Sequence, residues 1–181
     1  MICSKLKDCT IEQFAGKTVS KCVNGNVKCV ESSDKRSNVK CEERKKKYIL
    51  ENTAKNQVIS YRMDGGIIRL DKSVPEETCK CDYLVLINRK ENDAILVELK
   101  GVDVAHALKQ IKGTLNLFND YFASFSHVYG RVVVASATPN LKATPDYVNL
   151  IKVFRKVFRG NIKIAERQFR ERDIDLDKEI K

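Results

Sequence analysis

Tyr83-Leu84-Val85-Leu86-Ile87 and Ala94-Ile95-Leu96-Val97 are two continuous apolar runs, separated by the polar stretch Arg89-Lys90-Glu91-Asn92-Asp93. Short apolar runs that flank a polar turn are typical of strands whose two faces are both buried. The stretch therefore predicts a β-hairpin at the centre of a sheet that is covered on both sides.

Downstream of the hairpin, the sequence alternates between helical and extended patterns. Asp103 can cap a helix whose apolar residues recur at helical spacing over 104–118. A buried strand is expected over 131–136, a second apolar helical stripe over 147–158, and a short strand over 162–164. This order predicts an α/β fold with a mixed central β-sheet flanked by helices.

Upstream of the hairpin, the segment 39–53 fits two descriptions. It can be a charged helix, or a turn followed by a strand that starts at Tyr48. The segment 57–62 predicts a strand, Asp64-Gly65-Gly66 predicts a turn, and 67–70 predicts a return to extended structure.

These patterns divide the chain into three parts. Residues 1–38 form an N-terminal extension of uncertain structure, and 39–166 form the α/β domain. Gly160 is a suitable stop for the second helix. Residues 167–181 are dominated by charge, so we expect a solvated tail.

The overall charge bears on the partner and the location of the chain. It has 181 residues and a net charge of +10 at pH 7. A strongly basic surface favours a polyanionic partner, of which nucleic acid is the commonest. There is no apolar run of membrane-spanning length and no signal-peptide pattern after Met1. We therefore expect a cytoplasmic protein with no membrane partner.

The seven cysteines, at positions 3, 9, 22, 29, 41, 79 and 81, are an odd number in a chain without a secretion signal. A disulfide framework is therefore not expected. A zinc site built from Cys22, Cys29, Cys79 and Cys81 would need spacings of six residues and one residue. Structural zinc sites usually have two to four intervening residues. The sequence favours reduced, structural thiols.

Three charged residues lie at the ends of the two apolar runs. Asp82 precedes the first run, and Glu98 and Lys100 follow the second. If Asn88 pairs with Ala94 across the turn, Asp82 lies opposite Lys100 and diagonal to Glu98. All three side chains then project to one face, at Cβ separations of about 5–8 Å. Two carboxylates at that separation can share a divalent cation.

Asp82, followed downstream by Val97-Glu98-Leu99-Lys100-Gly101, resembles the PD-(D/E)xK nuclease superfamily, which has the restriction endonuclease-like fold. In that family the Asp and the Glu come from adjacent antiparallel strands and hold magnesium, and the Lys helps to activate water. The resemblance covers roughly residues 39–136. The proline that often precedes the Asp is replaced by Cys81.

The resemblance also implies roles for residues around these three. The backbone carbonyl of Leu99 would be a further metal ligand, and Gln110 matches a glutamine on the helix after the Glu-x-Lys motif. An acidic residue on an upstream helix often completes the site, for which Glu43 or Glu42 is the candidate. The expected cofactor is Mg²⁺, with Mn²⁺ as a substitute.

The expected function is therefore Mg²⁺-dependent hydrolysis of phosphodiester bonds by an endonuclease, with DNA favoured over RNA. A homodimer or a partner protein would be a source of specificity. Basic residues that could contact phosphates are Lys45, Lys46, Lys47, Lys109, Lys112, Arg155, Lys156 and Arg159.

Two other functions and one structural alternative stay open. The chain could be a catalytically inactive nucleic-acid-binding or protein-assembly module on the same fold, or a protein–protein interaction domain. Asp82 and Lys100 could also form a plain buried ion pair, with Glu98 at an exposed strand end.

Overall fold

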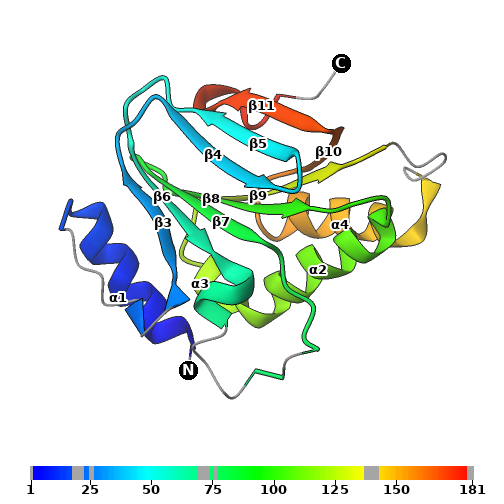
Figure 1. The fold of residues 1–181 in the computed structure, drawn as a ribbon, viewed down its shortest axis with the longest axis horizontal. Coiled ribbons are helices and arrows are strands. Elements are labelled where there is room, and N and C mark those ends of the chain that lie inside the picture. The colour runs from blue at the N-terminus through cyan, green and yellow to red at the C-terminus, as the bar shows by residue number, and fades with distance from the viewer. Residues whose placement is uncertain are drawn as a thin grey trace.

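A computed structural model describes residues 2–17, 23–24, 27–68, 74–75, 77–136 and 143–178 (Figure 1). Its main sheet has six strands in the order β10-β9-β8-β7-β6-β3. Strands β8, β9 and β10 run parallel, whereas β8, β7, β6 and β3 are antiparallel neighbours, so the sheet is mixed. The strands are β3 Val30–Asp34, β6 Gln57–Arg62, β7 Tyr83–Asn88, β8 Asp93–Leu99, β9 His127–Val134 and β10 Ile162–Glu166.

A smaller sheet covers one face of the main sheet. Its strands lie in the order β11-β5-β4, with β4 spanning Asn38–Glu43, β5 spanning Lys46–Glu51 and β11 spanning Gln168–Arg172. Figure 1 shows α2, α3 and α4 on the opposite face. The helices are α1 Ile2–Phe14, α2 Val104–Leu117, α3 Asn119–Phe122 and α4 Pro145–Lys156. A further pair of short strands comprises β1 (Val23–Asn24) and β2 (Val27–Lys28).

Strand β8 shows why the sequence folds into these layers. Its residues are all buried, and alternate side chains enter two separate cores. Ala94 and Leu96 pack in the core beneath the helices, whereas Ile95 and Val97 pack against the small sheet. The expected hairpin with two buried faces, and the mixed sheet flanked by helices, are confirmed.

Several expected elements are present with small changes of boundary. Strand β6 spans the predicted 57–62, and α2 begins after Asp103, whose side chain accepts a hydrogen bond from His106 N. α4 ends at Lys156, and the left-handed residue that follows is Arg159, with φ 52°, rather than Gly160. Gly160 is needed for another reason, since a side chain there would overlap the Val128 carbonyl.

The hairpin register differs from the prediction by two residues. Tyr83 pairs with Val97 and Leu84 with Leu96, and the ladder ends at Ile87 and Asp93. The turn has the predicted length but lies one residue earlier, at 88–92, because Asp93 pairs with Ile87 instead of belonging to the turn. The buried Asp93 carboxylate contacts Arg89 and is hydrogen-bonded to His127 Nδ1. A shift of two residues keeps every side chain on its face. Continuing the register by one residue places Asp82 opposite Glu98 rather than Lys100.

The ambiguous segment 39–53 is a β-hairpin and contains no helix. Val39 and Cys41 on β4, and Tyr48 and Leu50 on β5, are buried with the two-residue period of a strand. The turn between the strands is Arg44-Lys45. Elsewhere upstream, Ile67 and Ile68 belong to a turn rather than to extended structure, and residues 69–70 lie outside the described residues.

The charged segment after Arg167 is not a solvated tail over its first half. Residues 168–172 form β11, which pairs in parallel with β5. Phe169, Glu171 and Asp173 are buried. The charges are tolerated because Glu171 meets Arg131 and Lys163, which a count of charges along the sequence cannot reveal. Within the described ranges, no helix is both long and apolar enough to cross a membrane.

Candidate active site

The three predicted catalytic residues meet at one edge of the main sheet. Asp82 directly precedes β7, Glu98 is the penultimate residue of β8, and Lys100 directly follows β8. Figure 1 shows this edge on the right, where β8 leads toward α2 and the turn of the β4–β5 hairpin lies close by. The structure therefore brings Asp82, Glu98 and Lys100 together.

Asp82 extends the pairing of the β7–β8 hairpin through hydrogen bonds just beyond the last ladder pair. Its Oδ2 accepts a hydrogen bond from Leu99 N at 2.7 Å, and its carbonyl accepts one from Met63 N at 2.8 Å. Because strand pairing ends at Tyr83 and Val97, the carboxylate takes the place of a strand partner for Leu99. Burial raises the pKa of Asp82 to about 6, opposed by the Leu99 hydrogen bond.

Glu98 is almost completely buried, with an exposed fraction of 1%. Its Oε2 has no hydrogen-bond partner among the described residues. Burial, and then the charge of Asp82, raise the pKa of Glu98 to about 9. A buried carboxyl oxygen without a partner is costly to a fold. This cost identifies Glu98 as the residue of the site that a ligand would stabilise most.

Lys100 is half-buried beside the two acids. Its positive charge lowers the pKa of both Asp82 and Glu98, which places it within electrostatic reach of each. Among the described residues, no salt bridge joins Lys100 to Asp82. The alternative of a plain buried ion pair is therefore not what the structure forms.

The donor set fits a cation with few protein ligands. No group of three or more His, Cys, Asp or Glu side chains within the described residues could hold a metal. The charge of Asp82 nevertheless destabilises the charged form of Glu98, whose Oε2 lacks a hydrogen-bond partner among the described residues. Mg²⁺ commonly binds one or two carboxylates and retains several waters. The two acids could hold such an ion, and the further ligand expected at the Leu99 carbonyl stays a prediction.

The structure distinguishes between the two candidate upstream acids. Glu42 is exposed and its carboxylate is paired with Lys40 and Lys47. Glu43 raises the pKa of both Asp82 and Glu98, so its charge lies near theirs. Glu43 is therefore the upstream acid that approaches the site, and it comes from the end of β4 rather than from a helix.

Gln110 lies against the segment that leads into Asp82. Its Nε2 donates to the Lys80 carbonyl at 3.0 Å, while its Oε1 is buried without a partner among the described residues. One turn later, Thr114 Oγ1 accepts a hydrogen bond from Cys81 N at 2.8 Å. α2 thus fixes the backbone on which Asp82 is mounted, and a direct catalytic role for Gln110 stays a prediction.

Asp64, which the sequence predicts only as a turn residue, is a further acid near the site. Its charge raises the pKa of Asp82, and its carboxylate lies 3.7 Å from Lys80 Nζ. Pairing the predicted strand 57–62 antiparallel to the first apolar run would have brought Asp64 next to Asp82. That long-range pairing was the missing signal.

The basic residues expected to contact phosphates have different environments. Lys46 is buried and donates to the Arg44 carbonyl, and Lys47 is paired with Glu42, so neither is a free surface cation. Lys45, Lys109 and Lys112 are exposed. Arg155 and Lys156 lie in the last turn of α4, close to Arg159.

The thiols show no disulfide among the described residues. Cys41, Cys79 and Cys81 are free thiols, and Cys22 lies outside the described residues. Burial raises the pKa of the Cys41 thiol to about 12, so this cysteine is a neutral core residue at physiological pH.

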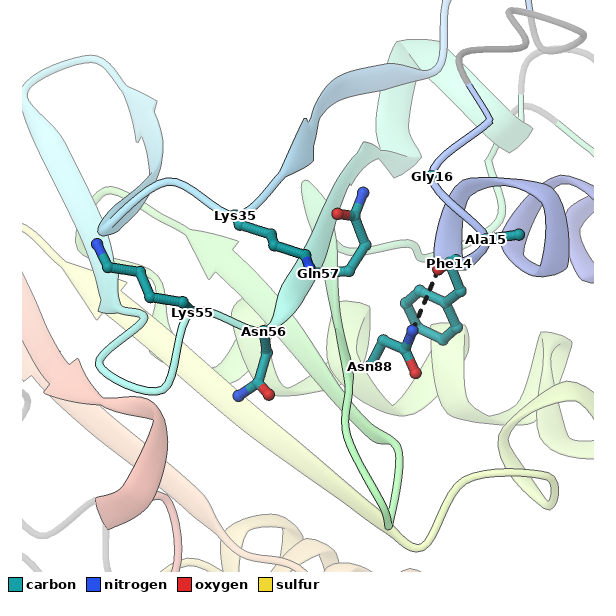
Figure 2. A pocket seen from close by; sticks show the side chains of 8 residues that line it. All are labelled: Phe14, Ala15, Gly16, Lys35, Lys55, Asn56, Gln57 and Asn88. Carbon is teal, nitrogen blue, oxygen red and sulfur yellow. Dashed lines mark hydrogen bonds between the residues drawn. The ribbon is translucent and has the colours of Figure 1, made fainter.

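A polar pocket of about 320 Å³ lies at the other end of the main sheet (Figure 2). Asn88, at the far end of β7 from Asp82, lines it and donates to the Phe14 carbonyl at 3.2 Å. Lys35 and Asn56 also line it, and none of its described lining residues is acidic. The pocket is therefore separate from the carboxylate site.

Comparisons with protein-family models, with curated proteins and with solved structures return no match to this chain. The arrangement of Asp82, Glu98 and Lys100 is therefore the feature of the chain that bears on its function.

Proposed function

We propose that the chain is a Mg²⁺-dependent nuclease that hydrolyses phosphodiester bonds, with DNA as its favoured substrate and endonucleolytic action. The observation that carries the proposal is the proximity of the Asp82 and Glu98 carboxyls beside the Lys100 cation, with the buried Glu98 Oε2 lacking a hydrogen-bond partner among the described residues. The resemblance to the PD-(D/E)xK nuclease superfamily supports it, since the residues agree with that family in type, order and strand context.

In this mechanism Asp82 and Glu98 hold the metal through their carboxylates. When bound, Mg²⁺ polarises the scissile phosphate and lowers the pKa of a water ligand. Lys100 would orient the attacking water and stabilise the negative charge that develops on the phosphate oxygens. Glu43 would add negative charge that favours a cation at the site, and Gln110 keeps the Asp82 segment in place through the Lys80 carbonyl.

The net charge of +10 supports a polyanionic substrate. The main alternative is an inactive nucleic-acid-binding or assembly module on the same fold. The complete set of two acids and one lysine argues against that alternative, because a module without catalysis has no need to bury an unpartnered Glu98.

The test is cleavage of labelled plasmid DNA, linear DNA and RNA with Mg²⁺ or Mn²⁺. Wild type is compared with Asp82→Asn, which keeps an acceptor for Leu99 N, and with Lys100→Ala. Asp120→Asn and Lys90→Ala, at exposed positions away from the site, are matched controls. We expect metal-dependent cutting that Asp82→Asn abolishes and Lys100→Ala slows by about 10²–10³-fold.

The controls are expected to cut at the wild-type rate. Absence of cutting by folded wild type on all three substrates would reject the nuclease, as would cutting that survives both site variants. In the first case, metal-independent binding of nucleic acid would favour the inactive module.

A further inference from the structure

The turn of the β4–β5 hairpin carries two cations in an unusual backbone conformation. Glu43 pairs with Lys46, so the turn consists of Arg44 and Lys45 alone. Both residues have positive φ, 45° and 68°. Two-residue turns of this type strongly favour Asn-Gly, because long side chains are strained at positive φ. Backbone strain of this kind is often found at binding sites, so the choice of Arg and Lys calls for an explanation.

The hairpin turn is held next to the candidate active site. Tyr83 Oη donates to the Glu42 carbonyl at 3.2 Å, and Tyr83 directly follows Asp82. β4 also contacts β8, the strand that carries Glu98, and Figure 1 shows the hairpin turn at the same end of the molecule as the end of β8. The cations of the turn therefore border the acidic pair.

Most other charges of the hairpin are already neutralised or buried. Lys40 and Lys47 are paired with Glu42, and Lys46 donates to the Arg44 carbonyl at 3.3 Å from a buried position. The Arg44 side chain is 87% exposed, and its salt bridge among the described residues is a long contact of 3.7 Å with Glu43. Lys45 is exposed. Arg44 and Lys45 thus remain as solvent-facing cations on a turn whose position is fixed by the hydrogen bond from Tyr83.

We infer that Arg44 and Lys45 bind the sugar–phosphate backbone of nucleic acid, on phosphates adjacent to the one that lies at Asp82 and Glu98. The inference rests on the proposed function and assigns a substrate contact to the same site. Phosphate contacts position a strand without reading its sequence. An anionic strand at the acidic pair needs such cations, since the two carboxylates alone would repel it.

The test replaces the turn by its favoured dipeptide. Arg44→Asn with Lys45→Gly removes two charges and relieves the strain at positive φ, so the fold is retained and we expect no decrease in the melting temperature. The control, Lys35→Asn with Lys90→Asn, removes two exposed charges at the opposite end of the main sheet. Binding of a short duplex DNA is measured with Mg²⁺ in a Lys100→Ala background, where cleavage is slow.

We expect the turn variant to bind roughly 10-fold more weakly at low salt, because two phosphate contacts are lost. The slope of log K against log salt should decrease in magnitude by about 1.8, which is 0.9 for each contact. The control variant should change neither quantity. With Lys100 restored, the turn variant should need more DNA than wild type to reach half of its maximal single-turnover rate.

Three results are distinguishable from one another. A turn variant that binds DNA with the wild-type affinity and salt slope overturns the inference and leaves the nuclease proposal intact. Turn-dependent binding without any cleavage by the chain that retains Lys100 supports the inference and rejects the nuclease. If the Lys100→Ala protein binds no nucleic acid at low salt, either with or without the turn substitutions, the inference is overturned as well.

Discussion

Asp82 and Glu98 keep their protons to an unusually high pH. In an unfolded chain such carboxyls ionise near pH 4, whereas burial raises the pKa of Asp82 to about 6 and that of Glu98 to about 9. Between pH 4 and these raised pKa values, the folded state binds more protons than the unfolded state. The free energy of unfolding therefore falls as the pH rises through this window.

We predict that urea unfolding with EDTA shows this loss of stability from about pH 4 to about pH 9. Glu98→Gln removes the larger part of it and raises the free energy of unfolding at pH 8 by roughly 1–3 kcal/mol. Glu91→Gln, at an exposed loop position, is the control. A pH profile unchanged by Glu98→Gln would show that Glu98 ionises normally.

Metal binding should reverse this loss of stability at high pH, because a cation favours the charged carboxylates. We predict that Mg²⁺ raises the melting temperature more at pH 8 than at pH 6, since protons compete with the metal. At 100 times its dissociation constant, Mg²⁺ would add about 2.7 kcal/mol to the free energy of unfolding. Asp82→Asn should abolish this stabilisation, and Asp120→Asn should not. Equal stabilisation of all three proteins would place the ion elsewhere.

At the scale of elements, helix α2 fixes the segment that leads into β7 and carries Asp82. Gly113 lies where the segment before β7 crosses the helix, and a Cβ there would overlap the Cys79 carbonyl oxygen. The segment 79–81 can approach α2 closely only because this position lacks a side chain, and the same approach allows Cys81 N to reach Thr114.

We predict that Gly113→Ala lowers the free energy of unfolding by about 1–3 kcal/mol through overpacking. It should also lower the cleavage rate of the remaining folded protein, because Asp82 moves with its segment. Gly101→Ala is the control for stability, since an added Cβ there meets nothing within 4 Å. A Gly113→Ala protein with wild-type stability would mean that the segment 79–81 can move away from α2 without a loss of stability.

Elements with a clear periodicity could be predicted from the sequence. The hairpin of β7 and β8, helix α2 with its Asp103 cap, and the shared face of Asp82, Glu98 and Lys100 all follow from local patterns. The register did not, because Asp93, which the sequence predicts in the turn, is buried at the start of β8, where it contacts Arg89 and His127. Glu43 and Asp64 approach the site through strand pairings distant in sequence, so their spacing carries no signal of their proximity.

At the scale of the whole molecule, a buried ionic cluster joins the two sheets. Arg131 on β9 is fully buried, and its guanidinium binds Glu171 on β11. Glu171 also accepts hydrogen bonds from Lys163 at 3.2 Å and from Tyr48 at 3.0 Å. One carboxylate from the small sheet thus compensates two cations from the main sheet.

We predict that Glu171→Gln lowers the free energy of unfolding by about 3–5 kcal/mol, because it leaves Arg131 and Lys163 uncompensated. Both sheets should unfold in one transition, seen equally by circular dichroism and by tyrosine fluorescence. Glu166→Gln, at an exposed position, should be close to wild type. Separate transitions for the two probes would show that the sheets are independent.

The pairing of β11 with β5 also sets the order in which the molecule can assemble. Gln168 pairs with Lys47, so this parallel ladder closes one of the longest loops in the chain. Contacts between residues far apart in sequence slow folding, because the entropy of closing the loop is lost before the contacts form. Among the described residues, Glu171 is the carboxylate that pairs with Arg131, so water can be excluded from between the sheets only once Glu171 is in place. The local hairpin of β7 and β8 can form early, but its acids acquire their buried surroundings only when the most distant strands have met.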